Sequence, residues 1–318
     1  MRVLVTGGSS LLGRKVAKAL AQRGDAVSCF QRSASGSGLP DRLGDIRDRS
    51  QVLAAAEGVD AIVHLAALVA PKPRWDDAFD INVLGTDHVI EAAARCGRLV
   101  HVSSPSVAFN DGPAVGERSL PAIYGGNDAY ARSKAIAERS VLAASSVPTV
   151  VLRPHLVWGP GDVQLVGRII DRARQGRLVL PDHGVAMIDT TYIDDAASAI
   201  VAGLDHAVEG DDACGRPWVV TGGDPRPVVE LVEGILAAAG VEGHIRSAPA
   251  PLAAAVGRLV ELAWRGDEPP LTQFAARQLS VAHWFDQREV RAVLGWEPLV
   301  GIDEGFRRLA QFYAQPTA

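Results

Sequence analysis

Arg2-Val3-Leu4-Val5-Thr6-Gly7-Gly8-Ser9-Ser10-Leu11-Leu12-Gly13 opens the chain with an apolar run, a glycine-rich turn and the start of an amphipathic stretch. The apolar run of residues 2–6 predicts a buried strand, and the stretch that begins at Leu11 predicts a helix. Gly7 permits a tight turn after the strand, and Gly13 permits the helix to pack closely on it. Because the N–H groups at the start of such a helix bind a pyrophosphate, this opening predicts a dinucleotide-binding βαβ unit.

Short β-branched runs alternate with alanine-rich stretches through the first half of the chain. The helices are expected to stop before Gly24 and Gly97, each of which supplies a left-handed cap. This alternation is typical of right-handed βαβ units, so we expect an α/β fold, a Rossmann-type doubly wound parallel sheet. The strands are expected at residues 2–6, 26–31, 61–65, 99–103 and 149–153.

After residue 153 the sequence changes to turns rich in glycine and proline, such as Gly159-Pro160-Gly161-Asp162, with helices between them. We therefore expect residues 1–153 to form a dinucleotide-binding Rossmann domain and residues 154–318 to form mainly a smaller C-terminal substrate-binding lobe. A strand candidate at residues 218–221 leaves open that part of the second half returns to the sheet. The lobe should cover the carboxyl ends of the strands, where ligands bind in doubly wound sheets.

Composition narrows the class of protein. The net charge of −5, with dispersed basic residues, argues against nucleic acid and against a polybasic membrane anchor as partners. We expect no metal site, because Cys29, Cys96 and Cys214 and the eight histidines lack metal-ligand spacing. Met1 leads directly into the first strand without a signal peptide, so we expect a cytoplasmic protein.

The most apolar late stretch covers residues 251–264 and contains Arg258 and Glu261. It is shorter than the ~20 residues of a membrane-spanning helix, so we expect no transmembrane segment. An amphipathic helix that lines a pocket is the main expectation for this stretch. A helix on a membrane surface and plain core packing are the alternatives.

Tyr130-Ala131-Arg132-Ser133-Lys134 places a phenol and an ammonium four residues apart, on one face of a helix. A phenol, with an ordinary pKa of about 10, is a poor base at neutral pH. A nearby ammonium or oxidised nicotinamide favours the phenolate, so the pair is suited to proton transfer beside a dinucleotide. An aromatic side chain packed on a helix face is the structural alternative for Tyr130.

Several further motifs make the chain resemble the extended short-chain dehydrogenase/reductase family over nearly its whole length. The resemblance implies that Tyr130 is the catalytic acid/base, that Lys134 holds the nicotinamide ribose and lowers the tyrosine pKa, and that Ser104 hydrogen-bonds the reacting oxygen. Ser103 is the alternative to Ser104 in that role. The motifs that carry the resemblance are residues 6–13, Asp45-Ile46, His64-Leu65-Ala66-Ala67, Asn82-Val83-Leu84-Gly85-Thr86, Ser103-Ser104, and Tyr130 with Lys134.

The same resemblance indicates which residues bind the dinucleotide. Ser10 stands where the family has a middle glycine, and its side chain is expected to crowd the pyrophosphate. Asp45-Ile46 is expected to contact the adenine, with a simple surface turn as the alternative, and Asn82 is expected to organise nearby backbone. The cofactor-binding residues are expected to be Thr6, Gly7, Ser9, Ser10, Leu11, Leu12, Gly13, Gln31, Arg32, Asp45, Ile46, Leu65, Ala66, Ala67, Asn82, Tyr130, Lys134 and Pro154.

The end of the second predicted strand points to the choice of cofactor. An NAD site places a carboxylate there, to bind both ribose hydroxyls. This chain has Gln31 and Arg32, and no carboxylate occurs between residues 27 and 40. Arg32, with Arg14 or Lys15, can pair with a 2′-phosphate, so we expect NADP(H) to be preferred over NAD(H). The alternative is that Arg32 is only a solvated charge.

The exit of the strand at residues 149–153 predicts the kind of substrate. Nucleotide-sugar enzymes of this family commonly have Arg-x-x-Asn-Val-Tyr-Gly-Pro here, and this chain has Arg153-Pro154-His155-Leu156-Val157-Trp158-Gly159-Pro160. Leu156 removes the amide, and Trp158 adds apolar surface. We therefore expect a small lipophilic substrate in contact with Ser104, His155, Leu156 and Trp158, with a core histidine as an equal alternative for His155.

Within the family, four segments resemble the 3β-hydroxysteroid dehydrogenase branch, and most closely the bacterial 2-alkyl-3-oxoalkanoate reductases of olefin biosynthesis. These enzymes reduce a 3-keto acid with two alkyl chains to the 3-hydroxy acid with NADPH, beside pathway-enzyme partners. The substrate carboxylate is expected to pair with Arg153, Arg168, Arg172 or Arg277. The segments are residues 103–107, 154–162, 268–272 and 282–286.

Three other functions remain open at this stage. The first is oxidation of a 3β-hydroxysteroid or sterol, and the second is nucleotide-sugar epimerisation or dehydration. The third, of a different class, is a non-catalytic NADP(H)-binding regulator. Because family dimers often pair through the helix that carries the Tyr and Lys, a homodimer is expected, with Ala135, Ala137 and Val141 as contacts.

Overall fold

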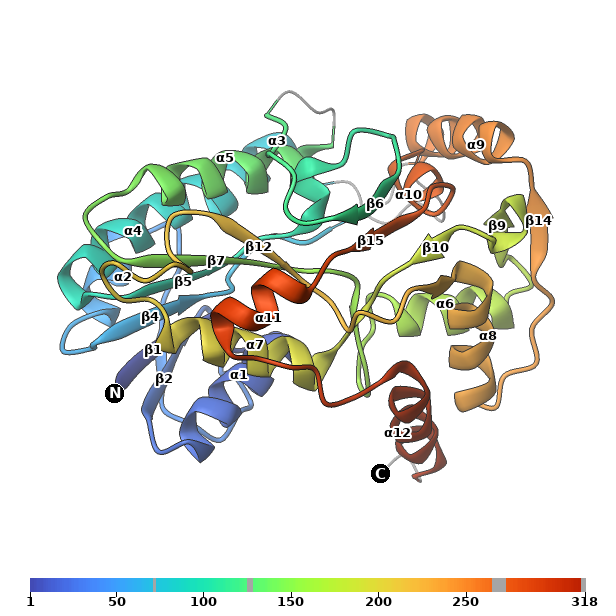
Figure 1. Cartoon of the computed structure of the whole chain (residues 1–318). Helices are drawn as coiled ribbons and strands as arrows, with labels where there is room; N and C mark the ends of the chain where they lie inside the picture. The colour runs from blue at the N-terminus through green and yellow to red at the C-terminus, as the bar shows by residue number, and fades with distance from the viewer. Residues whose placement is uncertain (71–72, 125–127, 265–272, 316–318) are drawn as a thin grey trace.

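A computed structural model describes residues 1–70, 73–124, 128–264 and 273–315. Its centre is a seven-stranded sheet in the order β12-β7-β5-β4-β1-β2-β3, in which every neighbouring pair is parallel (Figure 1). This is the order of a dinucleotide-binding sheet, which confirms the predicted fold class. The strands are β1 (Arg2–Thr6), β2 (Ala26–Gln31), β3 (Asp41–Leu43), β4 (Ala61–His64), β5 (Leu99–Val102), β7 (Thr149–Pro154) and β12 (Pro217–Val220).

Helices cover both faces of this sheet (Figure 1). Successive side chains of a strand point to opposite faces, so β1 sends Val3 and Val5 into one core and Leu4 into the other. The Val3 face packs against α1 (Leu11–Gln22), α7 (Ile193–Asp205) and α11 (Arg288–Leu294). The Leu4 face packs against α2 (Arg49–Ala55), α4 (Gly85–Cys96) and α5 (Ala129–Ala143).

The predicted strands of the first half are present, each within one residue of the expected bounds. The candidate at residues 218–221 is β12, which pairs with β7 at the edge of the sheet. β12, α7 and α11 pack with the Rossmann unit, so part of the second half returns to it, as the sequence leaves open. The sequence does not predict β3, because its three residues form an edge strand without apolar alternation.

The C-terminal lobe lies beyond the carboxyl end of β7 (Figure 1). A mixed sheet, β13-β10-β15-β6, and a separate apolar core that includes Ile188 and Leu231 hold it together. Its strands and helices are β6 (Ala114–Glu117), β8 (Val157–Trp158), α6 (Val166–Arg174), β9 (Val179–Pro181), β10 (Met187–Ile188), β11 (Thr191–Tyr192), β13 (Arg226–Pro227), α8 (Val228–Ala238), β14 (Arg246–Ala248), α9 (Ala250–Ala263), α10 (Gln273–Gln278), β15 (His283–Phe285) and α12 (Ile302–Ala314).

Short helical segments link the sheet to the site. α3 (Trp75–Ala78) leads into a π-helix, Phe79–Leu84, that runs directly into α4, and a 3₁₀ turn, Pro105–Ala108, follows β5. A third short segment, Asp182–Gly184, follows β9. None of the helices within the described ranges is long and apolar enough to cross a membrane.

The face of α5 proposed for a dimer is not at the surface. Ala135 and Ala137 are 0% exposed and Val141 is 1% exposed, because α5 packs these residues onto its own chain. The expectation that they form dimer contacts is therefore wrong. A homodimer that uses other residues stays a prediction.

Candidate active site

The turn after β1 needs glycine at two positions. Gly7 has a φ of +74°, and a Cβ there would lie 2.8 Å from the backbone nitrogen of Ala66. A Cβ on Gly13 would lie 2.2 Å from the carbonyl oxygen of Gly7. The Ser10 hydroxyl caps α1 by accepting from the Gly13 N–H across 2.9 Å, so it is engaged with the helix start.

A carboxylate that the sequence analysis missed lies beside the end of β2. Gln31 Nε2 donates to Asp41 Oδ1 across 2.7 Å, and the other oxygen of Asp41 accepts from the Ser35 N–H across 3.0 Å. Gln31 Oε1 is buried without a hydrogen-bond partner in the described chain, 3.0 Å from the position of a Cβ on Gly8. The signal in the sequence is Asp41 itself, but its place beside Gln31 follows only from β3, which the sequence does not predict.

The two cations of α1 expected near a 2′-phosphate have partners on the protein. Lys15 pairs with Asp194 across 2.6 Å, and Arg14 donates to the carbonyl oxygen of Ser9. Arg32 is exposed. Its positive charge adds slightly to the lowering of the Asp45 pKa, which Arg47 mainly causes. Of the three expected cations, Arg32 is the one for which the described chain shows no hydrogen bond or ion pair.

The remaining dinucleotide motifs lie at the carboxyl edge of the sheet. Asp45 is hydrogen-bonded to Arg47, which lowers the pKa of the Asp45 carboxyl to about 2, and Ile46 packs against Gly85. Asn82 Oδ1 accepts from the Leu68 N–H across 2.7 Å, so Asn82 fixes the backbone that follows residues 65–67. Organisation of backbone is the role predicted for Asn82, whereas direct contact with the cofactor stays a prediction.

Tyr130 and Lys134 lie one turn apart near the start of α5, which Asp128 caps by accepting from the Ala131 N–H across 2.7 Å. Lys134 is 3% exposed, and its ammonium donates to the carbonyl oxygen of Val102, at the end of β5, across 2.7 Å. Burial lowers the pKa of Lys134 to about 8 and raises the pKa of Tyr130 to about 12. The phenol of the protein alone is therefore protonated at neutral pH.

The Ser104 side chain lies near Tyr130 and opposes part of the rise in the phenol pKa that burial causes. The Ser106 hydroxyl donates to Ser104 Oγ across 2.9 Å, so the Ser104 hydroxyl keeps its own proton for another acceptor. Sequence reasoning missed Ser106, although the spacing Ser104-Pro105-Ser106 is that of a serine turn. The Ser103 hydroxyl is buried and has no hydrogen-bond partner in the described residues.

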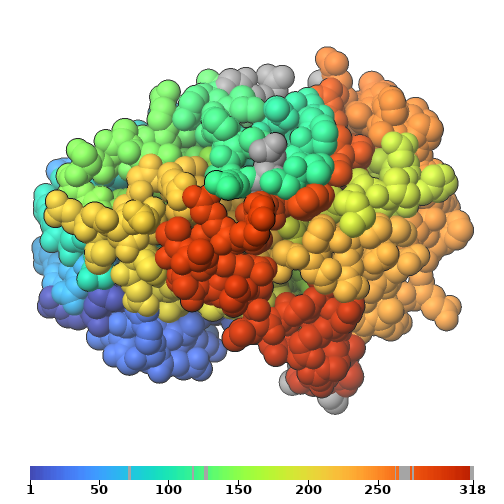
Figure 2. Space-filling model, viewed as in Figure 1, coloured from blue at the N-terminus to red at the C-terminus, as the bar shows by residue number. Residues whose placement is uncertain are grey.

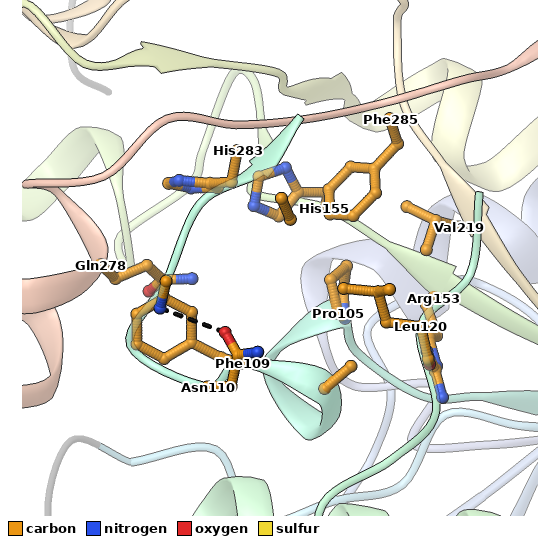
Figure 3. A pocket seen from close by; sticks show the side chains of 13 residues that line it. Pro105, Phe109, Asn110, Leu120, Arg153, His155, Val219, Gln278, His283 and Phe285 are labelled. Carbon is orange, nitrogen blue, oxygen red and sulfur yellow. Dashed lines mark hydrogen bonds between the residues drawn. The ribbon is translucent and has the colours of Figure 1, made fainter. Parts of the chain in front are cut away.

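A small cavity of about 30 Å³ lies beside this serine turn, where His155, His283 and Phe285 face one another (Figure 3). Burial holds the pKa of both imidazoles below its ordinary value, so both are neutral. His283 Nδ1 must donate to the carbonyl oxygen of Val281 at 2.8 Å, which leaves Nε2 as an acceptor. Neither His155 Nδ1 nor His283 Nε2 has a partner in the described chain, so each can bind an oxygen-bearing group.

The structure separates the expected substrate residues. His155 lines the cavity, whereas Leu156 and Trp158 do not. Trp158 is 1% exposed, donates to Thr190 Oγ1 across 3.0 Å and packs on Tyr192 in the core of the lobe. The expectation that Trp158 contacts substrate is therefore wrong, because its indole is committed to the core.

Two of the arginines expected near the substrate carboxylate are paired within the protein. Arg153 forms a buried ion pair with Glu138 and also donates to the carbonyl oxygen of Leu120. Arg277 pairs with Asp111 across 2.5 Å. Arg153 is thus a structural cation. The family-like segment at residues 268–272 lies outside the described residues.

α9 lines a second, larger cavity of about 840 Å³, which confirms the expected amphipathic helix beside a pocket. The cavity lies between α9 and α10, with Ala254, Ala255 and Leu259 on one wall and Val281 on the other. Figure 2 shows α9 at the molecular surface, above the rest of the lobe. Burial raises the pKa of Asp128, the cap of α5, and the charge of Glu261 near the end of α9 adds to this rise.

Comparisons with known proteins agree with this geometry. Residues 3–220 match the NAD dependent epimerase/dehydratase family. The chain is 41% identical over 325 residues to the 2-alkyl-3-oxoalkanoate reductase of Stenotrophomonas maltophilia (strain K279a), covering 97% of this chain and 98% of that protein. It is 35% identical over 327 residues to the 2-alkyl-3-oxoalkanoate reductase of Shewanella oneidensis, covering 96% and 84%.

A solved structure extends the comparison to the fold. The UDP-glucose 4-epimerase of Thermus thermophilus, in complex with NAD, matches this structure with a TM-score of 0.74 and 25% identity, over 100% of both chains. The match therefore includes the glycine turn, the Tyr-Lys helix and the parallel sheet together with the rest of the chain. The chain therefore belongs to the NAD dependent epimerase/dehydratase family and is an NAD(P)-dependent oxidoreductase of the extended short-chain dehydrogenase/reductase type.

Proposed function

We propose that this protein interconverts a ketone and a secondary alcohol on a lipophilic substrate, a 2-alkyl-3-keto acid that is reduced to the 3-hydroxy acid. The observation that carries the proposal is a Tyr130 phenol that burial keeps protonated, close to the Ser104 side chain and one helical turn from the buried Lys134 on α5. In the direction of reduction, Tyr130 donates its proton to the substrate oxygen, and the Ser104 hydroxyl stabilises the charge that develops there. The nicotinamide supplies the hydride.

Three features of the chain fit a bound dinucleotide. The turn leaves no room for a Cβ at Gly7 or Gly13, and α1 begins beside it with N–H groups that suit a pyrophosphate. Gln31 Oε1 is a buried acceptor without a partner in the described chain, which suits a ribose hydroxyl. The Lys134 ammonium, close to Tyr130 on α5, suits the hydroxyls of the nicotinamide ribose.

Within this site we propose that NADP(H) is preferred over NAD(H). The support is Arg32, an exposed cation directly after β2, where a 2′-phosphate would lie. Asp41 is a carboxylate near the end of β2, a feature that favours NAD(H). Both of its oxygens, however, already accept hydrogen bonds, from Gln31 and Ser35. Competitive titration of the two reduced cofactors tests the preference. We expect Arg32→Ala to weaken NADPH binding and to leave NADH binding unchanged, and NADH that binds the wild type as tightly as NADPH would reject it.

The support for a 2-alkyl-3-keto acid comes from the two relatives and from the cavity between α9 and α10. Its α9 wall is apolar apart from Arg258, and the stretch from Ala250 to Leu259 is about 14 Å long at the ordinary helix rise. We propose that one alkyl chain lies along this wall, with the keto group of the substrate toward Tyr130 and the neutral histidines.

A series of 2-alkyl-3-hydroxy acids of increasing chain length tests the substrate assignment. We expect kcat/KM to rise with chain length in the wild type. Ala254→Phe, which fills the groove, should abolish that rise and leave the shortest acids unaffected. Val256→Phe on the exposed face of the same helix is the matched control and should behave as the wild type. Equal chain-length dependence in Ala254→Phe and the wild type would reject the groove, and no oxidation of any hydroxy acid would reject the substrate class.

A further inference from the structure

A continuous chain of buried hydrogen bonds runs from the end of β1 to α5. Its members are Thr6, His64, Thr86, Asn82 and Ser133, all of which are at most 1% exposed. They come from β1, β4, the π-helix, α4 and α5, so the chain crosses from the sheet to the helix layer. His64 is the first residue of the motif His64-Leu65-Ala66-Ala67. Neither the cofactor assignment nor the substrate assignment gives His64 a role.

Each hydrogen bond in this chain has one allowed direction. Asn82 Nδ2 donates to Ser133 Oγ across 2.9 Å, and the Ser133 hydroxyl donates to the Tyr130 carbonyl oxygen across 2.9 Å. The Thr86 hydroxyl must donate to the Asn82 carbonyl oxygen at 2.6 Å, because a carbonyl only accepts. Thr86 Oγ1 therefore accepts from His64 Nε2 at 3.0 Å.

The same reasoning fixes the other side of the imidazole. His64 Nδ1 lies 2.7 Å from Thr6 Oγ1 and, in this tautomer, accepts the threonine proton. Thr6 Oγ1 in turn accepts from the Ala66 N–H across 3.2 Å. Burial holds the pKa of His64 at about 3, so the imidazole stays neutral, as this pattern requires.

We propose that His64 is a positioning residue, which fixes Tyr130 relative to the dinucleotide turn through the chain Thr6-His64-Thr86-Asn82-Ser133. One end of the chain holds Thr6 and Ala66, which abut Gly7, and the other end holds the backbone of Tyr130 itself. Every polar group along it is satisfied, and a fully satisfied buried network has one geometry. The inference rests on the proposed catalytic role of Tyr130.

His101 supplies a matched control. It lies beside His64 in register on β5, with the two ring centroids 5.3 Å apart, and it is 0% exposed. Neither of its ring nitrogens has a hydrogen-bond partner in the described chain. His64→Leu and His101→Leu thus remove equally buried imidazoles from the same layer, but only one of them belongs to the network.

The test compares kcat, the KM of each substrate, the dinucleotide Kd and the thermal unfolding of these two variants. We expect His64→Leu to lower kcat by about 10- to 100-fold. A displacement of a catalytic group by about 1 Å can lower the rate by a factor of this size. Its dinucleotide Kd should change by less than about threefold, and His101→Leu should retain the wild-type kcat at a comparable loss of stability. The proposal would be overturned if both variants kept the wild-type kcat, or if both lost kcat by the same factor.

Milder substitutions keep the test valid if His64→Leu does not fold. His64→Gln retains a donor near the position of Nε2, and we expect it to recover part of the kcat lost in His64→Asn, which reaches only the Nδ1 side. A double-mutant cycle of Thr6→Val and Ser133→Ala, at the two ends of the chain, should be non-additive in kcat. An additive cycle, or His64→Asn equal to His64→Gln, would overturn the proposal.

Two readouts separate this inference from the proposed function. The nitrogen chemical shifts of His64, assigned by comparison with His64→Gln, should report a neutral ring protonated on Nε2 alone, and an Nδ1–H form would contradict the network. The Tyr130→Phe variant reports the role of the phenol itself. An active Tyr130→Phe would reject the proposed function, whereas an inactive Tyr130→Phe with a normal His64→Leu would reject only the positioning role.

Discussion

Arg153 and Glu138 form an ion pair that is closed to solvent. Arg153 Nε donates to Glu138 Oε2 across 2.8 Å, and the two side chains are 1% and 2% exposed. The pair ties the end of β7 to α5, the helix that carries Tyr130 and Lys134. Because both oxygens of Glu138 accept from this guanidinium, Arg153 serves the architecture of the site and is not a candidate for binding the substrate carboxylate.

Removal of one partner from this pair should be costly. We expect Arg153→Met to lower the free energy of unfolding by about 3–5 kcal/mol, because it leaves the Glu138 carboxylate buried without the guanidinium that binds both of its oxygens. The double variant Arg153→Met/Glu138→Leu should regain most of that stability. Urea unfolding monitored by circular dichroism measures both. A single variant as stable as the wild type would show that the pair is solvated in solution.

The phenol of Tyr130 should be indispensable for turnover. We expect Tyr130→Phe to lower kcat by about 10²-fold or more, because the proton donor is lost while the packing of the ring is kept. The dinucleotide affinity, measured by titration of the intrinsic tryptophan fluorescence, should stay within about threefold of wild type. Retention of full activity in Tyr130→Phe would disprove the assignment.

The buried ammonium of Lys134 predicts a pH dependence for both activity and stability. Its pKa in the folded protein is about 8, so kcat/KM for reduction should fall as the pH rises above 8, whereas Tyr130, with a pKa of about 12, remains protonated. The folded pKa lies below the ordinary lysine value of 10.5, so the unfolded chain binds more protons between these values, and stability should increase from pH 8 to 10.5.

Thermal unfolding between pH 7 and pH 10 checks the stability half of this prediction. The wild type should gain stability over that interval relative to Lys134→Met, which has no ammonium to bury. Parallel curves for the two proteins would mean that the Lys134 ammonium is hydrated in solution. The kcat/KM profile of the wild type checks the other half, and a flat profile up to pH 10 would contradict it.

The Ser10 hydroxyl should act on stability more than on the cofactor. It accepts from the Gly13 N–H at the start of α1, so Ser10→Ala should lower the free energy of unfolding by about 1 kcal/mol. We expect the dinucleotide affinity of this variant to stay near wild type. Gly13→Ala is the contrasting change, because its Cβ would meet the carbonyl of Gly7 at 2.2 Å. Isothermal titration of both variants with NADPH separates the loss of the helix cap in Ser10→Ala from the distortion of the turn in Gly13→Ala. Tighter binding by Ser10→Ala would indicate that the serine crowds the pyrophosphate.

Much of the fold could be predicted because its signals are local. The apolar run before Gly7 and the glycine that ends α4, Gly97, fix where strands and helices begin and end. The three-residue edge strand β3 carries no such pattern, since its residues are partly or fully exposed. The sequence leaves the return of β12 to the sheet open, because pairing between distant strands depends on tertiary packing that periodicity does not report.

The same distinction holds for the candidate site. Tyr130 and Lys134 share a helix face by spacing alone, so the sequence predicts their proximity. The partners that tune the site come from distant segments. The pairing of Arg153 with Glu138 and the contact of His155 with His283 are tertiary events without a local signal. The prediction for Trp158 is wrong for a related reason, since an apolar residue at a strand exit fits a core and a pocket equally well.

The most direct test of the account is the absorbance of reduced nicotinamide after wild-type protein is mixed with NADP⁺ and a long-chain 2-alkyl-3-hydroxy acid. Parallel samples contain a 3β-hydroxysterol, a UDP-sugar, or the Tyr130→Phe variant with the hydroxy acid. We predict cofactor reduction with the hydroxy acid and wild-type protein, and none in the other three samples. A signal with the sterol and none with the hydroxy acid would contradict the proposed substrate, and an equal signal from Tyr130→Phe would contradict the proposed chemistry.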